Sequence, residues 1–222
     1  AEDIATLAIL NSTCLHTRLK AATSLRAHAL AVTEHSCTDA QMNTVGSKLI
    51  ADGWNWPIAS CLDPELGHQT AGTAFLSRSP IRAFEISVQS TKLKLLIDTG
   101  RISLVGIDFG DGTQVALFII YGWSGGRQNK RRSKRTDKLS KIAFEEYKTH
   151  PLAPNLFVGD YNATMNELPI TQEYIQQLKF TNMGAQADIW GTPTNQPTHI
   201  CKHSKEPSQL DYAFANQLVL PM

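Results

Sequence analysis

The sequence predicts an α/β fold, a four-layer α/β/β/α sandwich in which two mixed, mainly antiparallel sheets pack face to face with helices outside. Three observations favour it. The chain opens with a strand, helix, strand, helix rhythm, residues 72–121 hold successive strand candidates, and helical patterns return after residue 130. Because 222 residues suffice for one large domain and are few for two, we expect a single domain over residues 1–222.

Short apolar runs and helix formers define the N-terminal elements. Residues 4–10 form an apolar run of strand length, and residues 21–30 suit a helix that leads into a buried strand at residues 29–33. Asp39 is the expected N-cap of a helix that continues through Ile50 and stops near Gly53.

The centre and the C-terminal part alternate strands and helices. Gly110-Asp111-Gly112 predicts a hairpin turn, because its residues tolerate positive φ. The pattern therefore indicates antiparallel sheet. Strands are predicted at residues 73–77, 83–89, 92–97, 102–109, 115–121, 155–160 and 209–214, and helices at residues 137–148 and 171–180.

Composition excludes several classes of protein. No apolar run approaches the roughly 20 residues that cross a bilayer, so we expect no membrane partner. The four cysteines (Cys14, Cys37, Cys61 and Cys201) lack the close pairs of zinc sites and are too sparse for a disulfide framework, which favours a reducing, intracellular compartment. The first residues are acidic where a secretory signal would be basic.

One segment is strongly basic although the net charge is only +1. Two interpretations stay open. The segment is a solvated loop or helix start, or it contacts phosphate groups or directs nuclear import. Its cations, all within six residues, are Lys130, Arg131, Arg132, Lys134 and Arg135.

Polar side chains follow apolar strands at the points where those strands end. A single acid in this position is more often a turn or cap residue. Repetition at several strand ends favours a site assembled at a common edge of the scaffold. The residues are Asn11, Glu34, Tyr121, and Asp160 with Asn162.

These residue types suit hydrolysis at phosphorus. Carboxylates such as Glu34 bind Mg²⁺, a hard ion that accepts few protein oxygens. The two asparagines can hydrogen-bond a phosphate without adding negative charge. Asp160 can hold or deprotonate a water, and Tyr121 can donate to a nonbridging oxygen. The set indicates metal-assisted in-line attack.

Six segments resemble motifs of the endonuclease/exonuclease/phosphatase superfamily, in its order and over nearly the whole chain. Gly159-Asp160-Tyr161-Asn162 is similar to its G-D-[FLY]-N motif. The others are residues 9–11 (Ile-Leu-Asn), 32–35 (Val-Thr-Glu-His, similar to Q-E-[TH]), 72–78, 118–121 and 209–214.

The resemblance implies a role for each matching residue. Glu34 would be the principal ligand of Mg²⁺, with Mn²⁺ as an alternative, and Asn11 would lie close to the ion. Asp160 and Asn162 would position the water and the phosphate. Tyr121 would donate to the transition state, Asp211 would orient a phosphate-binding histidine, and Thr198 would lie at the site's edge.

The sequence departs from the family pattern at its end. No Ser-Asp-His motif follows Asp211, while His199 and His203 precede it, on the wrong side of that strand. We therefore expect the final strand and loop to be missing and the chain to be a fragment of a longer protein. The interval between Asn11 and Glu34 is also short for the family.

The first functional hypothesis is a DNA endonuclease that resembles the nicking domains of non-LTR retrotransposons. The resemblance implies that Arg131, Arg132, Lys134 and Arg135 lie near the substrate, which points to DNA as the partner, a nuclear location and no protein partner. The alternatives are a phosphatase, a lipid or inositol phosphodiesterase, or an impaired relic that only binds. The four tryptophans (Trp54, Trp56, Trp123 and Trp190) are expected to be packed in the core or at its edge.

Overall fold

The computed structural model describes residues 5–61, 71–149, 153–200 and 207–219. The chain forms two compact units, Ala1–Tyr121 and Gly122–Met222.

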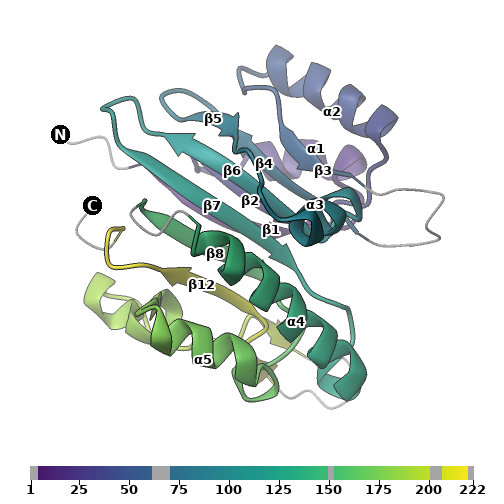
Figure 1. Cartoon of the computed structure of the whole chain (residues 1–222). Coiled ribbons are helices and arrows are strands. Elements are labelled where there is room, and N and C mark those ends of the chain that lie inside the picture. Colours follow the sequence, from purple (N-terminus) through teal and green to yellow (C-terminus); the bar gives the residue numbers. More distant parts are fainter. Residues whose placement is uncertain (1–4, 62–70, 150–152, 201–206, 220–222) are drawn as a thin grey trace. The chain divides into compact units, whose positions relative to one another are not determined.

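Elements of the first unit (Figure 1) are β1 (Leu7–Asn11), α1 (Leu15–Thr23), β2 (Ala29–Thr33), α2 (Asp39–Ala51), β3 (Ile58–Ser60), β4 (Thr73–Ser77), β5 (Arg82–Glu85), α3 (Thr91–Asp98), β6 (Ile102–Asp108) and β7 (Gln114–Tyr121). Those of the second are α4 (Lys130–Tyr147), β8 (Asn155–Asp160), α5 (Pro169–Gln177), β9 (Thr181–Asn182), β10 (His199–Ile200), β11 (Pro207–Ser208) and β12 (Asp211–Ala215).

Two sheets pack face to face in the first unit. One has the order β1-β2-β4-β3, with β1 parallel to β2 and the other pairs antiparallel. The other contains the antiparallel strands β5, β6 and β7. Leu30 and Val32 of β2 join the core cluster beneath α1 and α2. Between the sheets, the hydroxyls of Thr73 and Ser103 are hydrogen-bonded at 2.8 Å.

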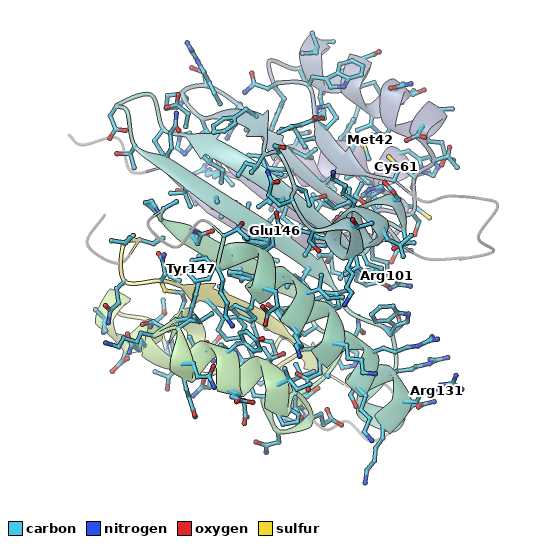
Figure 2. The ribbon with its side chains drawn as sticks, in the orientation of Figure 1. Met42, Cys61, Arg101, Arg131, Glu146 and Tyr147 are labelled. Atoms are coloured by element: carbon cyan, nitrogen blue, oxygen red, sulfur yellow. The ribbon has the colours of Figure 1, made fainter. Side chains whose placement is uncertain are left out.

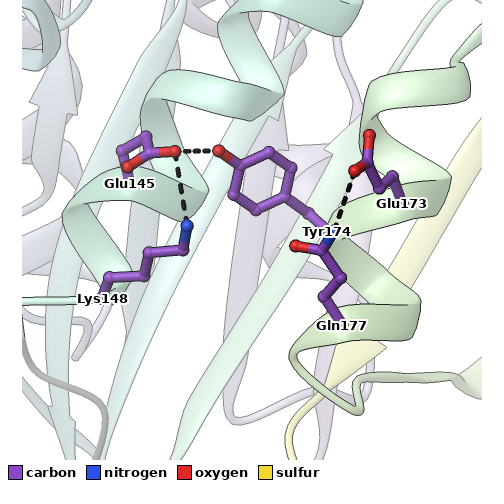
Figure 3. A network of polar contacts seen from close by, with 5 residues as sticks. All are labelled: Glu145, Lys148, Glu173, Tyr174 and Gln177. Atoms are coloured by element: carbon purple, nitrogen blue, oxygen red, sulfur yellow. Dashed lines mark hydrogen bonds and ion pairs between the residues drawn. The ribbon is translucent and has the colours of Figure 1, made fainter.

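The second unit packs two helices on strands. β12 pairs antiparallel with β8 and β9. Phe144 of α4 stacks on Phe157 of β8 and on Tyr174 of α5, with ring centroids 4.3 and 5.5 Å apart. The Tyr174 hydroxyl also donates to the Glu145 carboxylate, which pairs with Lys148 at 3.5 Å (Figure 3). This network fixes α5 against α4.

The structure corrects several predicted elements. Residues 92–97 form helix α3 and no strand, because the Ser90 hydroxyl caps it by accepting from the Leu93 N–H at 3.3 Å. α1 spans Leu15–Thr23, ahead of the predicted residues 21–30, and the N-cap of α2 is Thr38 instead of Asp39. α4 starts at Lys130, which identifies the basic segment as a helix start.

Exposure corrects one prediction for the tryptophans. Trp54 is buried as expected, whereas Trp56 is 52% exposed. Trp123 is half-buried, and the side chain of Trp190 lies outside the described part of the chain, as do Cys201 and His203. Cys14, Cys37 and Cys61 are free thiols. Among the described helices, none combines the length and apolar character needed to span a bilayer.

Candidate active site

Asn11 and Glu34 lie at the same edge of the first unit's parallel strand pair. Asn11 ends β1 opposite Thr33, the last residue of β2, and Glu34 follows directly. The Ser12 N–H donates to the Thr33 carbonyl at 3.0 Å, which continues the pairing past the strand ends. Asn11 is exposed and Glu34 half-buried. The sheet thus brings together the two residues predicted to surround a metal ion.

The backbone that carries Glu34 has an unusual conformation. Glu34 and Ser36 have φ of 57° and 50°, in the left-handed region that non-glycine residues rarely adopt. Between them, His35 is fully buried. Its Nδ1 accepts the Cys37 N–H at 3.0 Å, and its Nε2 lies 3.2 Å from the Ser60 carbonyl oxygen. Burial lowers the pKa of His35 to about 4, so the ring is neutral at pH 7.

Tyr121 ends β7 fully buried, beside a buried arginine that the sequence did not single out. The Tyr121 N–H donates to the Arg101 carbonyl at 2.9 Å, and the Arg101 guanidinium lies 4.9 Å from the centre of the Tyr121 ring. Arg101, labelled in Figure 2, is only 6% exposed. The sequence offers one signal for this residue. Arg101 directly precedes an apolar strand, and the following strand along the chain ends in Tyr121.

Backbone hydrogen bonds connect the Glu34 segment to Arg101. The His35 N–H donates to the Gly72 carbonyl at 3.3 Å, and the Gly72 N–H donates to the Gly100 carbonyl at 2.8 Å. Gly100 immediately precedes Arg101. The first unit therefore collects a carboxylate, an amide, a phenol and a guanidinium around one end of its two sheets.

The donors beside Glu34 fit a magnesium ion better than a zinc ion. Glu34 and Asn11 offer oxygen, and Mg²⁺ binds few protein oxygens while keeping several waters. The Thr33 hydroxyl, buried one residue before Glu34, has no hydrogen-bond partner within the described ranges, so a polar atom there requires water or ligand. No cluster of three or more His, Cys, Asp or Glu side chains suited to a metal occurs among the described residues.

In the second unit, two carboxylates face each other across a strand pair. Asp160 ends β8 directly opposite Asp211, the first residue of β12. Asp160 is 6% exposed. Burial raises the pKa of Asp211, although a hydrogen bond with Thr198 and the nearby His199 oppose the shift. Burial therefore favours the neutral form of Asp211 beside Asp160.

The turn after Asp160 is fixed by one local hydrogen bond and by hydrogen bonds with Gly122, which is distant in the sequence. The Asp160 Oδ1 accepts the Asn162 N–H at 2.8 Å, and Asn162 has φ of 53°. The Gly122 N–H donates to the Asp160 carbonyl at 2.7 Å, while the Asn162 side-chain amide lies 3.4 Å from the Gly122 carbonyl. A Cβ on Gly122 would meet the Tyr161 carbonyl oxygen at 2.2 Å. Only glycine permits this approach.

Thr198 lies beside Asp211, although it is exposed. Its hydroxyl oxygen accepts the N–H groups of Leu210 and Asp211 at 3.0 and 3.1 Å. Its own N–H donates to the Ser208 carbonyl at 3.0 Å. Thr198 therefore orders the start of β12, where Asp211 lies.

The basic segment forms the first turns of α4, next to the Asp160–Asn162 turn. Asn129 caps the helix, and Gly126 packs so tightly against the Asn162 carbonyl that an added Cβ would stand 2.4 Å from the oxygen. Arg132 donates to the Ser124 carbonyl at 2.7 Å. Arg131, Arg132, Lys134 and Arg135 are exposed, and Figure 2 shows Arg131 pointing away from the strands.

This concentration of cations is electrostatically unfavourable for the helix itself. A helix N-terminus carries partial positive charge, so cations in the first turns cost a few tenths of a kcal/mol each, up to about 1 kcal/mol. No acidic residue occupies the first turn of α4. The segment therefore creates a strongly positive surface at some expense of stability, as expected where anions bind.

Comparisons with known proteins give one family match and several similar folds. The model of the Endonuclease/Exonuclease/phosphatase family matches residues 10–221. A search of curated proteins by sequence found no match. Among solved structures, the Xenopus laevis APE2 catalytic domain aligns with a TM-score of 0.69 and 16% identity over 97% of this chain and 83% of its own.

Two further structures align over similar lengths. An AP endonuclease from Archaeoglobus fulgidus aligns with a TM-score of 0.68 and 9% identity, over 98% of this chain and 89% of its own. The 3′ phosphatase NExo from Neisseria, bound to a product DNA hairpin, aligns with a TM-score of 0.67 and 12% identity over the same shares. The predicted α/β fold, with sheets packed face to face, is confirmed.

Proposed function

Since the chain belongs to the endonuclease/exonuclease/phosphatase family, we propose that it is a metal-dependent phosphodiester hydrolase that nicks DNA. One observation carries the choice of substrate. The Asp160–Asn162 turn and the basic start of α4 lie against each other in the second unit, joined through Gly126. A hydrolytic carboxylate beside several exposed cations suits a polyanionic backbone, which binds through phosphate contacts.

Residues of the first unit would hold the metal and stabilise charge. Glu34 and Asn11 are the proposed ligands of Mg²⁺, which when bound supplies Lewis-acid stabilisation of the charge that develops on phosphate. Tyr121 is the proposed donor to a nonbridging phosphate oxygen. The Arg101 guanidinium, 4.9 Å from the Tyr121 ring centre, holds the ring and adds positive charge nearby.

Residues of the second unit would handle the water. We assign Asp160 to take the proton of the attacking water, and Asn162, whose backbone is fixed by the Asp160 Oδ1, to hydrogen-bond the phosphate. Asp211, opposite Asp160, would share the proton load because its pKa is raised by burial. Thr198 keeps Asp211 in place through its two backbone hydrogen bonds.

The similar structures support DNA as the substrate class. One of them contains a product DNA hairpin, and two others are an APE2 catalytic domain and an AP endonuclease. The basic segment is the particular feature that favours a retrotransposon-type nicking domain. The nuclear location remains a prediction from the same segment.

A supercoiled-plasmid nicking assay with Mg²⁺ tests the proposal. We expect the chain to convert supercoiled to open-circular DNA, and Asp160→Asn to lower the rate by about 10²- to 10⁴-fold. Asp52→Asn, on an exposed carboxylate at the end of α2, is the matched control and should leave the rate unchanged. Hydrolysis of inositol phosphates without plasmid nicking would refute the substrate. Mg²⁺-independent plasmid binding without cleavage would support a binding module instead.

A further inference from the structure

His35 is held in one orientation and one tautomer. Because the Cys37 N–H is a donor, the Nδ1 that accepts it at 3.0 Å carries no proton, and the ring proton is on Nε2. That N–H donates to the Ser60 carbonyl at 3.2 Å. Both ring nitrogens are therefore engaged with backbone groups, one two residues along the chain and one on β3.

The rest of His35 is equally constrained. Its ring lies where a side chain on Gly72 would stand, since a Cβ there would come within 2.4 Å of the imidazole Cε1. Its N–H donates to the Gly72 carbonyl, and its carbonyl accepts the Leu15 N–H at 3.2 Å. β3, Gly72 just before β4, and the start of α1 thus meet at the buried His35.

The neighbours of His35 need such support. Glu34 and Ser36, on either side, have left-handed backbones that are strained for residues other than glycine. Such conformations persist only where surrounding contacts determine them. The Cys37 bond closes a turn from the His35 side chain across Ser36, which holds the segment in this shape.

We propose that His35 is the positioning residue of the metal ligand Glu34, acting through its Nδ1 bond to the Cys37 N–H. The inference rests on the proposed role of Glu34. His35 touches neither metal nor substrate. It holds the backbone whose direction sets the Glu34 carboxylate, as outer-shell partners of metal ligands do.

Two amide substitutions separate this role from simple packing. In His35→Asn the side-chain oxygen can still accept the Cys37 N–H, in the manner of an Asx turn. In His35→Gln the amide lies one methylene further from the backbone, towards Ser60. The Cys37 N–H therefore loses its acceptor. Both are smaller than histidine and similar to each other in chemistry, so both should lower the melting temperature.

The measurement is Mn²⁺ affinity, by electron paramagnetic resonance or calorimetry, together with the Mg²⁺ activation constant and kcat. We expect His35→Gln to weaken Mn²⁺ binding by about 10- to 100-fold and His35→Asn by less than about threefold. In the nicking assay, the activation constant for Mg²⁺ should rise in His35→Gln while kcat at saturating Mg²⁺ is kept. Equal affinities in both variants, whether unchanged or lowered together with the melting temperature, would overturn the inference.

Glu34→Gln separates this inference from the proposed function. If it abolishes Mn²⁺ binding and the two His35 variants do not differ, Glu34 is the ligand and only the positioning role fails. If it leaves Mn²⁺ binding unchanged, the assignment of Glu34 fails, and the inference fails with it. If Mn²⁺ binding follows the expected order but plasmid is not nicked, the positioning role stands and the substrate is wrong.

Discussion

Two segments carry the candidate acids, and they are built differently. The Glu34 segment is held by distant groups, with His35 bonded to Ser60, 25 residues away, and packed on Gly72. The Asp160 turn combines a local bond to the Asn162 N–H, two residues along, with a bond from the distant Gly122 N–H to the Asp160 carbonyl. The local bond leaves a signature in the Gly159-Asp160-Tyr161-Asn162 motif, whereas the distant contacts of both segments leave almost none.

The largest expected effect tests whether the two segments serve one reaction. Glu34→Gln and Asp160→Asn should each lower the nicking rate by about 10²- to 10⁴-fold. If both act in the same step, the double variant should be little slower than the slower single variant, because groups that work as a unit are not additive. Rates from plasmid nicking, at matched Mg²⁺, give the comparison. Multiplied losses in the double variant would separate the two segments functionally.

This contrast explains which parts of the site could be predicted. Asp160 and Asn162 were recognisable within one tetrapeptide, Glu34 because it follows an apolar strand, and Tyr121 because it ends one. Arg101 was missed because nothing in its local sequence distinguishes a buried arginine from an exposed one. Its burial depends on the strand pairing that brings it beside Tyr121. The proposed role of His35 likewise depends on contacts with Ser60 and Gly72.

The fold was predictable where burial imposes a simple pattern. β2, β4 and β8 are continuous apolar runs, and their bounds agree with the predictions. α3 was misassigned because its apolar residues have no decisive period, and the Ser90 cap decides in favour of a helix. The start of α4 was missed because its basic turns lack the apolar spacing that marks a helix.

The basic start of α4 provides the next largest effect. Replacing Arg131, Arg132, Lys134 and Arg135 by alanine should weaken DNA binding by about 10-fold or more. It should also reduce the slope of log affinity against log salt by about 0.9 for each phosphate that the variant no longer neutralises. Fluorescence anisotropy at several salt concentrations measures both quantities. An unchanged slope would mean that the segment does not bind DNA.

A variant of the basic segment limited to Arg131→Ala and Lys134→Ala should be more stable than the wild type, because it keeps the Arg132 bond to the Ser124 carbonyl and the contact of Arg135 with Trp123. Removing cations from the positive end of the helix relieves an unfavourable interaction, so the melting temperature should rise slightly. Lys138→Ala with Lys141→Ala, two exposed cations further along α4, is the matched control. It should change the stability less and leave the salt slope nearly intact. A lower melting temperature in the basic-segment variant would contradict the electrostatic cost.

A glycine substitution tests how rigidly the Asp160 turn is packed. Gly122→Ala should lower the free energy of unfolding by about 1–3 kcal/mol, because its Cβ would overlap the Tyr161 carbonyl, which cannot move aside as a side chain could. Urea denaturation measures the loss. Gly184→Ala is the matched control, because its Cβ would meet the far end of the Gln209 side chain at 2.9 Å, which can move aside, so it should cost less. Equal losses in the free energy of unfolding would mean that the Asp160 turn rearranges to accommodate the added methyl group.

The smallest expected effect is the change in melting temperature when Asp211 is replaced. At neutral pH its sign should be opposite to that of the control substitution at Asp111. Burial raises the pKa of Asp211 above the ordinary 3.8, so the folded chain binds a proton more tightly than the unfolded chain does. Stability is therefore lost as pH rises from 3.8 through the raised pKa, and the loss persists at neutral pH. Asp211→Asn should unfold at a higher temperature than the wild type at pH 7, with the difference vanishing near pH 3.

Asp111, in the exposed hairpin turn, behaves in the opposite way. A hydrogen bond from the Thr113 N–H lowers its pKa, so its contribution is present above pH 3.8 and is lost as pH falls through the lowered value. Asp111→Asn should therefore lower the melting temperature at pH 7 and converge with the wild type in acid. If both variants shift in the same direction, burial does not govern Asp211, and the case for a proton shared between Asp160 and Asp211 loses its basis.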